Sequence, residues 1–585
     1  MKLASKQELD HLIAIYRSND LAAATLLAKR LANQYPDDCV IFNVLAVICI
    51  RNGDLSAARA SGEHAVSLNF SYRDAVFNLA DIYLRQKEFE RARVLISRWV
   101  RQNNEDTQSL GVLLEAANGL SEKHTALKYC ERLHDYGVAS ERLTILKSQL
   151  LQSLGRLEDA LAWIQAGDKQ YTHSHWLRIT EANILSDLGR IEEAHRLYES
   201  IKCDEPEQEK AHLLDFANFC IELGEFDRAE SKLETVLTRN PYEAQAWVGL
   251  SKLPMNKSTL ERLEVRLCNA LNNTDLPEND KAHLYFAHGH CAHKLNKYDS
   301  AFRSFAEGNR LRSQQTPFNF ESEKALFKNV RDVFEILDTQ RWPSNDIDIT
   351  PVFVVGLPRS GTTLIEQILG AHSDVSALGE VELLKAEFYQ WLISVKEQAL
   401  DTHALREITK NYLELMSLRA SGASHFVDKL PLNFVWLGFI ARLMPHARFI
   451  HISKSPLAAC WSLYKQEFKG YTCSYDFKSL SQYYGLYVEH MEYWRSKVHG
   501  SQLLEITYEG LVDDPIEHIG KILALCNLSQ DPKVLNFSGS NQSVRTLSAT
   551  QLRSGITSKF KSEVDVYRSF LQPLIENLKN EWIDV

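Results

Sequence analysis

The sequence predicts a multidomain chain, in which an all-α helical solenoid precedes an α/β domain with a parallel sheet and a P-loop-like turn. Short phrases recur every 34 residues in the first half, which is typical of stacked helical hairpins. At Pro351 the pattern changes to a β-branched apolar run, a glycine-containing turn and an amphipathic segment, the order expected of strand, loop and helix. A chain of 585 residues is also too long for one hydrophobic core.

Composition limits the classes of function. With 66 Lys and Arg against 76 Asp and Glu, the net charge of −10 argues against nonspecific nucleic-acid binding, which requires an excess of cations. The opening residues, MKLASKQELDHLIAIY, contain no apolar stretch of signal-peptide length, and no run of about 18 apolar residues follows. We therefore expect a soluble, cytoplasmic protein without a transmembrane segment. The 10 cysteines form no CxxC pair, so we expect reduced thiols and no metal site.

The repeat has a fixed internal pattern. Its turn positions, the first six of them 34 residues apart, are Asn19, Gly53, Lys87, Ser121, Gly155, Gly189, Gly224 and Asn296. Five positions after each turn stands an alanine: Ala24, Ala58, Ala92, Ala126, Ala160, Ala194, Ala229 and Ala301. In a helix–turn–helix unit the Gly or Asn supplies the turn, and the small alanine lets the paired helix approach closely. Such units must stack in order to bury their apolar faces.

This pattern resembles the tetratricopeptide repeat family over residues 5–315. Two uses of the array remain open: a scaffold that holds the second domain and could dimerise, or a concave surface that binds a protein or peptide substrate. Asn43 and Asn78, on the first helix of their units, are candidates for gripping peptide backbone, and they are also compatible with plain surface polarity. We expect residues 316–349 to form a linker that contains one helix, FESEKALFKNVRDVFEIL.

A candidate anion site lies in VFVVGLPRSGTTLIEQIL. At a strand–turn–helix junction, backbone N–H groups and the positive helix end converge on an anion. The spacing Gly356-x4-Gly361-Thr362-Thr363 mimics a nucleotide P-loop, but Thr362 stands where a P-loop has its lysine, and Arg359 supplies the charge instead. We expect one terminal phosphate to be held by Arg359, Ser360, Gly361, Thr362 and Thr363. The alternative is an ordinary glycine turn before a helix.

The same segment resembles the 5′-phosphosulfate-binding loop of sulfotransferases. GEVELL, FVDKLPLNF and MPHARFIHISKSPLAACWSLYKQEF follow it, in an order and spacing similar to tyrosylprotein sulfotransferases and to bacterial proteins that fuse tetratricopeptide repeats to a sulfotransferase domain. The resemblance implies a sulfotransferase domain over residues 350–580. It also implies 3′-phosphoadenosine-5′-phosphosulfate (PAPS) as the sulfuryl donor, 3′,5′-bisphosphorylated adenosine as the product and no metal. It does not specify the acceptor.

By this resemblance, three residues carry the chemistry. Glu380 is the general base that takes the acceptor proton, and its neighbour Glu382 is the alternative. Either residue could instead be a plain surface carboxylate. Lys429 contacts the bridging oxygen and the sulfuryl group, unless it is merely a solvated lysine. Arg359 adds positive charge at the 5′-phosphate. His372 could serve as the base by comparison with other sulfotransferase branches, but the resemblance places it in the helix after the loop, and we expect it to be structural.

The resemblance also implies a second phosphate site. In the family, an Arg at the end of a strand and a Ser eight residues later bind the 3′-phosphate, and here Lys454 and Ser462 hold those positions. Lysine keeps the charge but loses the bidentate fork of arginine, and Ser455 replaces the usual neighbouring Asp. Affinity for the 3′-phosphate could therefore be lower.

Later segments supply weaker candidates. Tyr508 could lie near the nucleotide or be a core aromatic residue, and Arg545 and Arg553 are candidate phosphate contacts or surface arginines. The family has an Arg-Trp pair before a Tyr in its closing segment, whereas this chain has Glu563 and Val564 before Tyr567.

The sequence favours a PAPS-dependent sulfotransferase that acts on a protein tyrosine, a saccharide or a small metabolite. A protein or peptide substrate could be held by the repeats. The alternative is a catalytically weakened nucleotide-binding scaffold that uses its repeats for protein–protein interaction, for which Lys454, Ser455, Glu563 and Val564 are the reasons. A kinase or NTPase on a similar fold is disfavoured because the P-loop lysine is missing.

Overall fold

The computed structural model describes residues 3–584 except 121, 172–173, 340–341, 343–347, 396–401, 469 and 536–558. The chain divides into two compact units, residues 1–172 and residues 173–585. Among the described residues, none of the helices has both the length and the apolar character that crossing a membrane requires.

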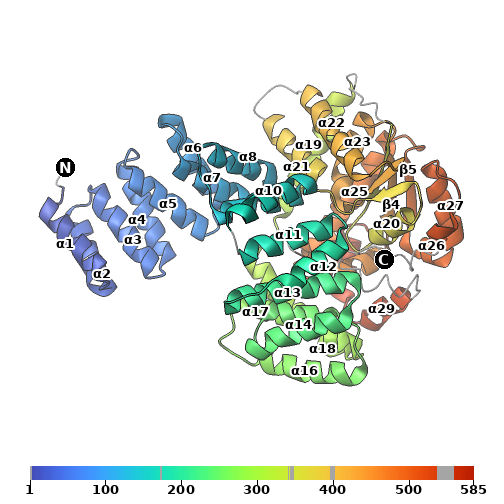
Figure 1. Ribbon diagram of the computed structural model, residues 1–585, viewed down its shortest axis with the longest axis horizontal. Helices are drawn as coiled ribbons and strands as arrows, with labels where there is room; N and C mark the ends of the chain where they lie inside the picture. The colour runs from blue at the N-terminus through green and yellow to red at the C-terminus, as the bar shows by residue number, and fades with distance from the viewer. Residues whose placement is uncertain are drawn as a thin grey trace. The chain divides into compact units, whose positions relative to one another are not determined.

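The first unit is a series of helical hairpins (Figure 1). Its helices are α1 Lys6–Arg17, α2 Leu21–Gln34, α3 Cys39–Arg51, α4 Leu55–Leu68, α5 Arg73–Arg85, α6 Phe89–Gln102, α7 Thr107–Gly119, α8 Lys123–Asp135, α9 Glu141–Ser153 and α10 Leu157–Gln170. The second unit begins with helical hairpins of its own, formed by α11 His175–Asp187, α12 Ile191–Ser200, α13 Pro206–Leu223, α14 Phe226–Arg239, α15 Ala244–Lys252, α16 Lys257–Leu271, α17 Glu278–Lys294 and α18 Tyr298–Gln315.

The recurring sequence positions have a shared conformation. The described turn residues all have positive φ: Asn19, Gly53, Lys87, Gly155, Gly189, Gly224 and Asn296. From Gly53 on, each of these described turns ends the first helix of its hairpin in a Schellman motif. In the first of them the Asp54 N–H donates to the Cys49 carbonyl and the Gly53 N–H donates to the Ile50 carbonyl. The alanine five positions later is 0% exposed in every unit. The 34-residue pattern is therefore a backbone requirement combined with a packing requirement.

Two segments of the second unit extend beyond the repeat pattern. Where the pattern weakens after Gly224, the chain still forms the helices α15 and α16. Helix α19, Phe320–Asp338, falls within the predicted linker and packs against α25 and η1, burying Phe327, Val330 and Phe334. It is therefore part of the core of the domain that follows.

That domain is built on a parallel sheet in the order β2-β3-β1-β4-β5. The strands are β1 Thr350–Val355, β2 Val375–Ala377, β3 His425–Asp428, β4 Arg448–Ser453 and β5 Leu503–Thr507. The helices and 3₁₀ turns that accompany them are α20 Thr362–Gly370, α21 Leu383–Val395, α22 Thr402–Arg419, η1 Pro431–Trp436, α23 Leu437–Leu443, α24 Pro456–Tyr464, η2 Thr472–Tyr475, α25 Phe477–Lys497, α26 Tyr508–Asp513, α27 Pro515–Leu525, η3 Pro532–Leu535, α29 Lys559–Tyr567 and α30 Gln572–Asn580.

The sheet is covered on both faces. On one face Val352 and Val354 of β1 and Ile450 and Ile452 of β4 pack with apolar residues of α20 and α27. On the other, Phe353 lies between the Phe449 ring, with centroids 5.5 Å apart, and the Tyr412 ring of α22, 6.1 Å away. Burial on both faces explains the uninterrupted apolar run VFVV.

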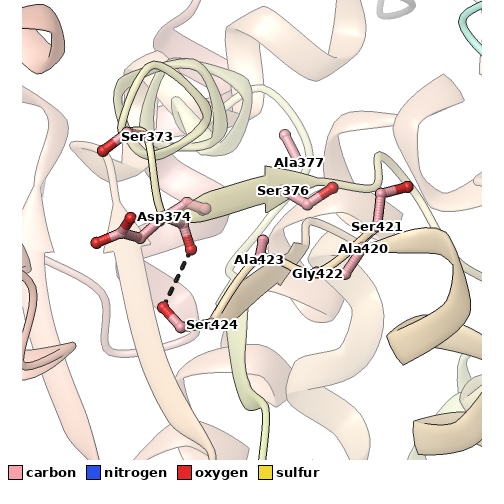
Figure 2. Close-up of a pocket in the computed structure, with 10 residues that line it drawn as sticks. Ser373, Asp374, Ser376, Ala377, Ala420, Ser421, Gly422, Ala423 and Ser424 are labelled. Carbon is pink, nitrogen blue, oxygen red and sulfur yellow. Dashed lines mark hydrogen bonds between the residues drawn. The ribbon is translucent and has the colours of Figure 1, made fainter.

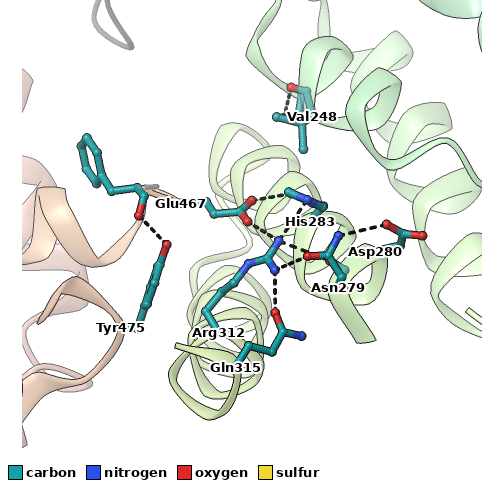
Figure 3. Close-up of polar contacts among 10 residues, drawn as sticks. Val248, Asn279, Asp280, His283, Arg312, Gln315, Glu467 and Tyr475 are labelled. Carbon is teal, nitrogen blue, oxygen red and sulfur yellow. Dashed lines mark hydrogen bonds and ion pairs between the residues drawn. The ribbon is translucent and has the colours of Figure 1, made fainter. Parts of the chain in front are cut away.

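The last repeats are joined to this domain by a buried polar contact (Figure 3). Glu467, just after α24, accepts from His283 of α17 at 2.6 Å and forms an ion pair with Arg312 of α18. Arg312 also donates to the Asn279 side chain at 2.7 Å. Nearby, the amide of Asn309 donates to the Tyr464 carbonyl at 2.8 Å. These contacts fix α17 and α18 against the end of α24.

Glu467→Gln should destabilise the chain by about 3 kcal/mol, because it leaves the buried Arg312 guanidinium without its carboxylate partner. The matched control is Glu489→Gln, whose carboxylate pairs with Arg331 while 59% exposed and should contribute below about 1 kcal/mol. Chemical denaturation of the full chain would measure both losses. Equal losses from the two variants would contradict a stabilising role for the buried pair.

Lys87→Gly should stabilise the α5–α6 hairpin by about 0.5–1 kcal/mol. Lys87 is exposed and holds φ at 61° where the other described turns use Gly or Asn, and a side chain in that region is strained. Slower hydrogen exchange of the α5 and α6 amides would report the gain. Lys87→Ala keeps the strain and should leave exchange unchanged, so an equal effect of both variants would rule out the backbone explanation.

Candidate active site

The fold brings the predicted site residues to one edge of the sheet. In a doubly wound parallel sheet, ligands bind beyond the carboxyl ends of the strands, near the point where the strand order reverses. Here Glu380 follows β2, Lys429 follows β3, Lys454 follows β4 and Tyr508 follows β5, while the glycine loop follows the central strand β1. All five strands are parallel, so these segments lie at the same edge.

The loop after β1 is shaped by its two glycines. Gly356 has φ 147°, and a Cβ there would lie 2.3 Å from the Ile452 carbonyl oxygen of β4. Gly361 has φ 110°, and a Cβ there would lie 2.7 Å from Cδ2 of Tyr508. The Ser360 hydroxyl donates to the Leu357 carbonyl at 2.6 Å, which closes the turn. Only glycine allows the loop to approach both β4 and Tyr508 this closely.

Helix α20 begins directly at this loop. Gly361 is its N-cap, and Thr362 and Thr363 form its buried first turn. Ser360 is 1% exposed. The first N–H groups of a helix have no partner within the helix and carry its positive dipole end, so this junction can bind a phosphate.

Arg359 and Lys454 lie close enough for their charges to interact. Burial lowers the pKa of Arg359 to about 10, against the opposing effects of Glu563 and Tyr508. Burial, together with the neighbouring charges of Lys465 and Arg359, lowers the pKa of Lys454 to about 8, against the opposing effects of Glu563 and Glu509. The two cations that were predicted to bind opposite phosphates therefore occupy one electropositive region.

Tyr508 lies against both the loop and Lys454. Its ring packs on Gly361 of the loop, and the Lys454 Nζ lies 5.0 Å from the ring centroid. Burial raises the pKa of the Tyr508 hydroxyl, and the Arg359 charge opposes the shift. An aromatic ring beside a lysine and a loop that opens a helix is a suitable surface for a nucleotide.

The third predicted cation, Lys429, is buried beneath two carboxylates. Its Nζ donates to Glu380 Oε1 at 2.6 Å and lies 3.6 Å from Glu366 Oε2. The Lys429 side chain is 1% exposed, whereas that of Glu380 is 50% exposed. Burial raises the pKa of Glu366, and Lys429 opposes the shift. The Lys429 ammonium is therefore enclosed by the protein, whereas the Glu380 carboxylate reaches solvent.

The other predicted residues lie in different surroundings. Ser462 is half-buried on α24, eight residues after Lys454. Glu382 is half-buried just before α21, and the ion pairs of Lys429 are to Glu366 and Glu380. His372 bonds to the Ser529 carbonyl at 3.1 Å and is buried, consistent with a structural part. Arg545 and Arg553 lie outside the described residues.

Two features of this edge were not predicted from the sequence. Glu366 is the buried second carboxylate of Lys429, and its signal was the one charge in the mostly apolar run LIEQIL. Lys465, at the end of α24, pairs with Glu563 of α29. No local pattern marks that pair, since its partners are far apart in sequence.

A pocket lies at the opposite edge of the sheet (Figure 2). It is lined by residues 373–377 and 420–424, around the amino ends of β2 and β3. The Ser424 hydroxyl donates to the Asp374 carbonyl at 3.3 Å on its wall. None of the predicted site residues lines it, so this pocket belongs to a different region from the cationic edge.

Known proteins are similar to this chain in both parts. Residues 351–532 match the model of the Sulfotransferase family, and residues 50–107 match a Tetratricopeptide repeat model. An uncharacterized protein of Aquifex aeolicus (strain VF5) is 28% identical over 430 residues, covering 68% of this chain but 54% of that protein. The chain therefore spans about half the length of this relative.

Shorter matches cover the C-terminal part. A putative protein-tyrosine sulfotransferase of Caenorhabditis briggsae is 27% identical over 36% of this chain and 78% of its own length. Protein-tyrosine sulfotransferase 1 of Danio rerio is 25% identical over 32% of this chain and 56% of its own length. This chain thus joins tetratricopeptide repeats to a domain of the sulfotransferase family.

Proposed function

We propose that this chain transfers the sulfuryl group of PAPS to an acceptor hydroxyl and releases 3′,5′-bisphosphorylated adenosine. The observation that supports this most is the single electropositive region formed by Arg359, Lys454 and Tyr508 beside the start of α20. A donor with two separated phosphates and an adenine ring needs two cations and an aromatic surface close together. A single phosphate would need only the loop.

The residues present fit such a donor. The loop from Arg359 to Thr363 would hold the 5′-phosphosulfate through backbone N–H groups and the Arg359 charge. Lys454, with Ser462 on the following helix, would hold the 3′-phosphate as a point charge rather than as a bidentate fork. Tyr508 lies between them and would contact the nucleoside.

Glu380 and Lys429 divide the chemistry. Glu380, half-exposed above the buried lysine, would take the proton of the acceptor hydroxyl as its oxygen bonds to sulfur. The bond between sulfur and the bridging oxygen breaks, and that oxygen keeps the electron pair as part of the departing phosphate. Lys429 would neutralise the charge developing there, from a position where water does not weaken its field.

For the acceptor we propose a hydroxyl group and not one particular molecule. A protein tyrosine is supported by the names of the C. briggsae and D. rerio relatives, and the repeats offer a surface for a protein substrate. A saccharide or a small metabolite would satisfy the same chemistry. The second candidate function is a nucleotide-binding scaffold, favoured by Lys454 in place of arginine and by the acidic Glu563 beside it.

Transfer from ³⁵S-labelled PAPS to a panel of tyrosine peptides, saccharides and phenols tests this proposal. Binding of 3′,5′-bisphosphorylated adenosine is measured in parallel by calorimetry on the full chain. Label transfer to one acceptor class supports the enzyme and names its substrate. Tight nucleotide binding without transfer to any acceptor would favour the scaffold, and failure of both would exclude the donor.

Glu380→Ala should reduce label transfer by about 10²–10⁴-fold, because the acceptor proton loses its base. Nucleotide affinity should stay within about twofold, since the proposed donor contacts are elsewhere. The matched control is Glu382→Ala, which should retain transfer. A loss confined to Glu382→Ala would move the base to that residue.

The affinity for 3′,5′-bisphosphorylated adenosine should fall as pH rises through about 8. Lys454 has a pKa of about 8 in the ligand-free chain, so above that pH it must take up a proton in order to bind phosphate. Lys454→Arg keeps its charge and should flatten the profile between pH 7 and 9 and tighten binding. Calorimetric titrations at these pH values would measure both effects. An unchanged profile in Lys454→Arg would remove Lys454 from the phosphate site.

A further inference from the structure

A buried ion pair that the sequence did not predict lies near Lys454. Lys465, which caps the end of α24, is 9% exposed, and its ammonium pairs with the Glu563 carboxylate of α29. The side chain of Glu563 is 17% exposed. Helix α24 is the one that begins just after Lys454 and carries Ser462. The pair therefore lies at the far end of the helix that borders the second phosphate site.

Glu563 is part of the charge balance of that site. Burial alone would raise its pKa, but Lys465, His293 and Lys454 together hold the pKa of Glu563 below its ordinary value. In return, Glu563 is the acidic group that favours the charged forms of both Arg359 and Lys454. One carboxylate thus interacts with cations of both phosphate sites.

Glu563 is held in place by the rest of α29. Tyr567, one helical turn later, is 0% exposed, and its hydroxyl lies 2.9 Å from His293 Nδ1 of α17. The Tyr567 ring is 4.5 Å from the Trp461 ring and 5.4 Å from the Tyr298 ring, measured between centroids. Residues four apart share a helix face, so this anchor directs Glu563 toward Lys465.

We propose that Lys465 is a further donor-binding residue and that Glu563 is a built-in anion, which a phosphate group of the donor replaces on Lys465. This inference rests on the proposed function, because it assumes a phosphorylated donor at this edge. A buried ammonium is stable only with a counter-charge, and Glu563 supplies one when the donor is absent. A carboxylate and a phosphate repel each other at such close range, so both cannot remain on the same lysine.

The proposed exchange gives a role to Glu563, which, with Val564, stands where the family has an Arg-Trp pair in its closing segment. Donor binding must then separate the Glu563 carboxylate from Lys465. That separation costs free energy, so the donor affinity is lower than the number of cations suggests. Lys465 adds a third positive charge to those of Arg359 and Lys454. It would supplement Lys454, which offers one ammonium where the family has an arginine fork. Removing the internal anion should therefore tighten binding, which an ordinary structural ion pair would not do.

Calorimetric titration of 3′,5′-bisphosphorylated adenosine and, separately, inorganic phosphate into the full-length variants tests the exchange. Glu563→Gln should bind both about tenfold more tightly than the unaltered chain, and Lys465→Gln should bind both about tenfold more weakly. Glu563→Asp, which keeps the charge on a shorter arm, should give an intermediate gain and serves if the glutamine variant does not fold. Asp565→Asn, which removes an exposed carboxylate two residues along the same helix, should change neither affinity.

The outcomes separate this inference from the proposed function. If the unaltered chain transfers sulfuryl groups but Glu563→Gln binds both probes equally or more weakly, the exchange is wrong and the enzyme assignment stands. If phosphate binds more tightly to Glu563→Gln while the adenosine bisphosphate binds to no variant, the exchange stands and the donor assignment fails. An equal gain in Asp565→Asn would reduce the effect to net charge and overturn the specific pairing.

Discussion

Positive charge buried at the carboxyl edge of the sheet is the constraint on which the rest of this domain depends. Separate segments bring Arg359, Lys429, Lys454 and Lys465 there. Burial lowers the pKa of Arg359 and of Lys454, and the side chains of Lys429 and Lys465 are themselves buried. Each cation therefore requires an anion from the protein or from a ligand. Glu366 and Glu380 serve Lys429, and Glu563 serves Lys465.

These counter-charges come from distant parts of the chain. Glu366 belongs to the helix after the glycine loop, Glu380 follows the edge strand β2, and Glu563 lies on a helix near the C-terminal end. The site is consequently complete only when all these segments have folded together. The repeats take part as well, because Tyr567, which positions α29, is anchored on His293 of α17.

The sequence predicted what depends on local rules. A turn residue with positive φ and an alanine that must be small both leave a mark at a fixed spacing, and a buried parallel strand followed by PRSGTT marks the anion loop. Long-range pairing leaves no such mark. Lys465 and Glu563, or Glu467 with His283 and Arg312, become neighbours only through tertiary folding, and the packing of α19 into the core was hidden because its own pattern fits an independent helix equally well.

The position of Glu467 has a consequence for the modularity of this architecture. It lies two residues after Lys465, so the contact that attaches the last repeats and the cation that pairs with Glu563 share one short stretch of backbone. A change that shifts this stretch therefore acts both on the contact with the last repeats and on the cationic edge of the sheet. Chimeras that exchange the repeat array should therefore keep α17 and α18 with the sheet domain, and variation among natural homologues should be concentrated in the hairpins that precede them.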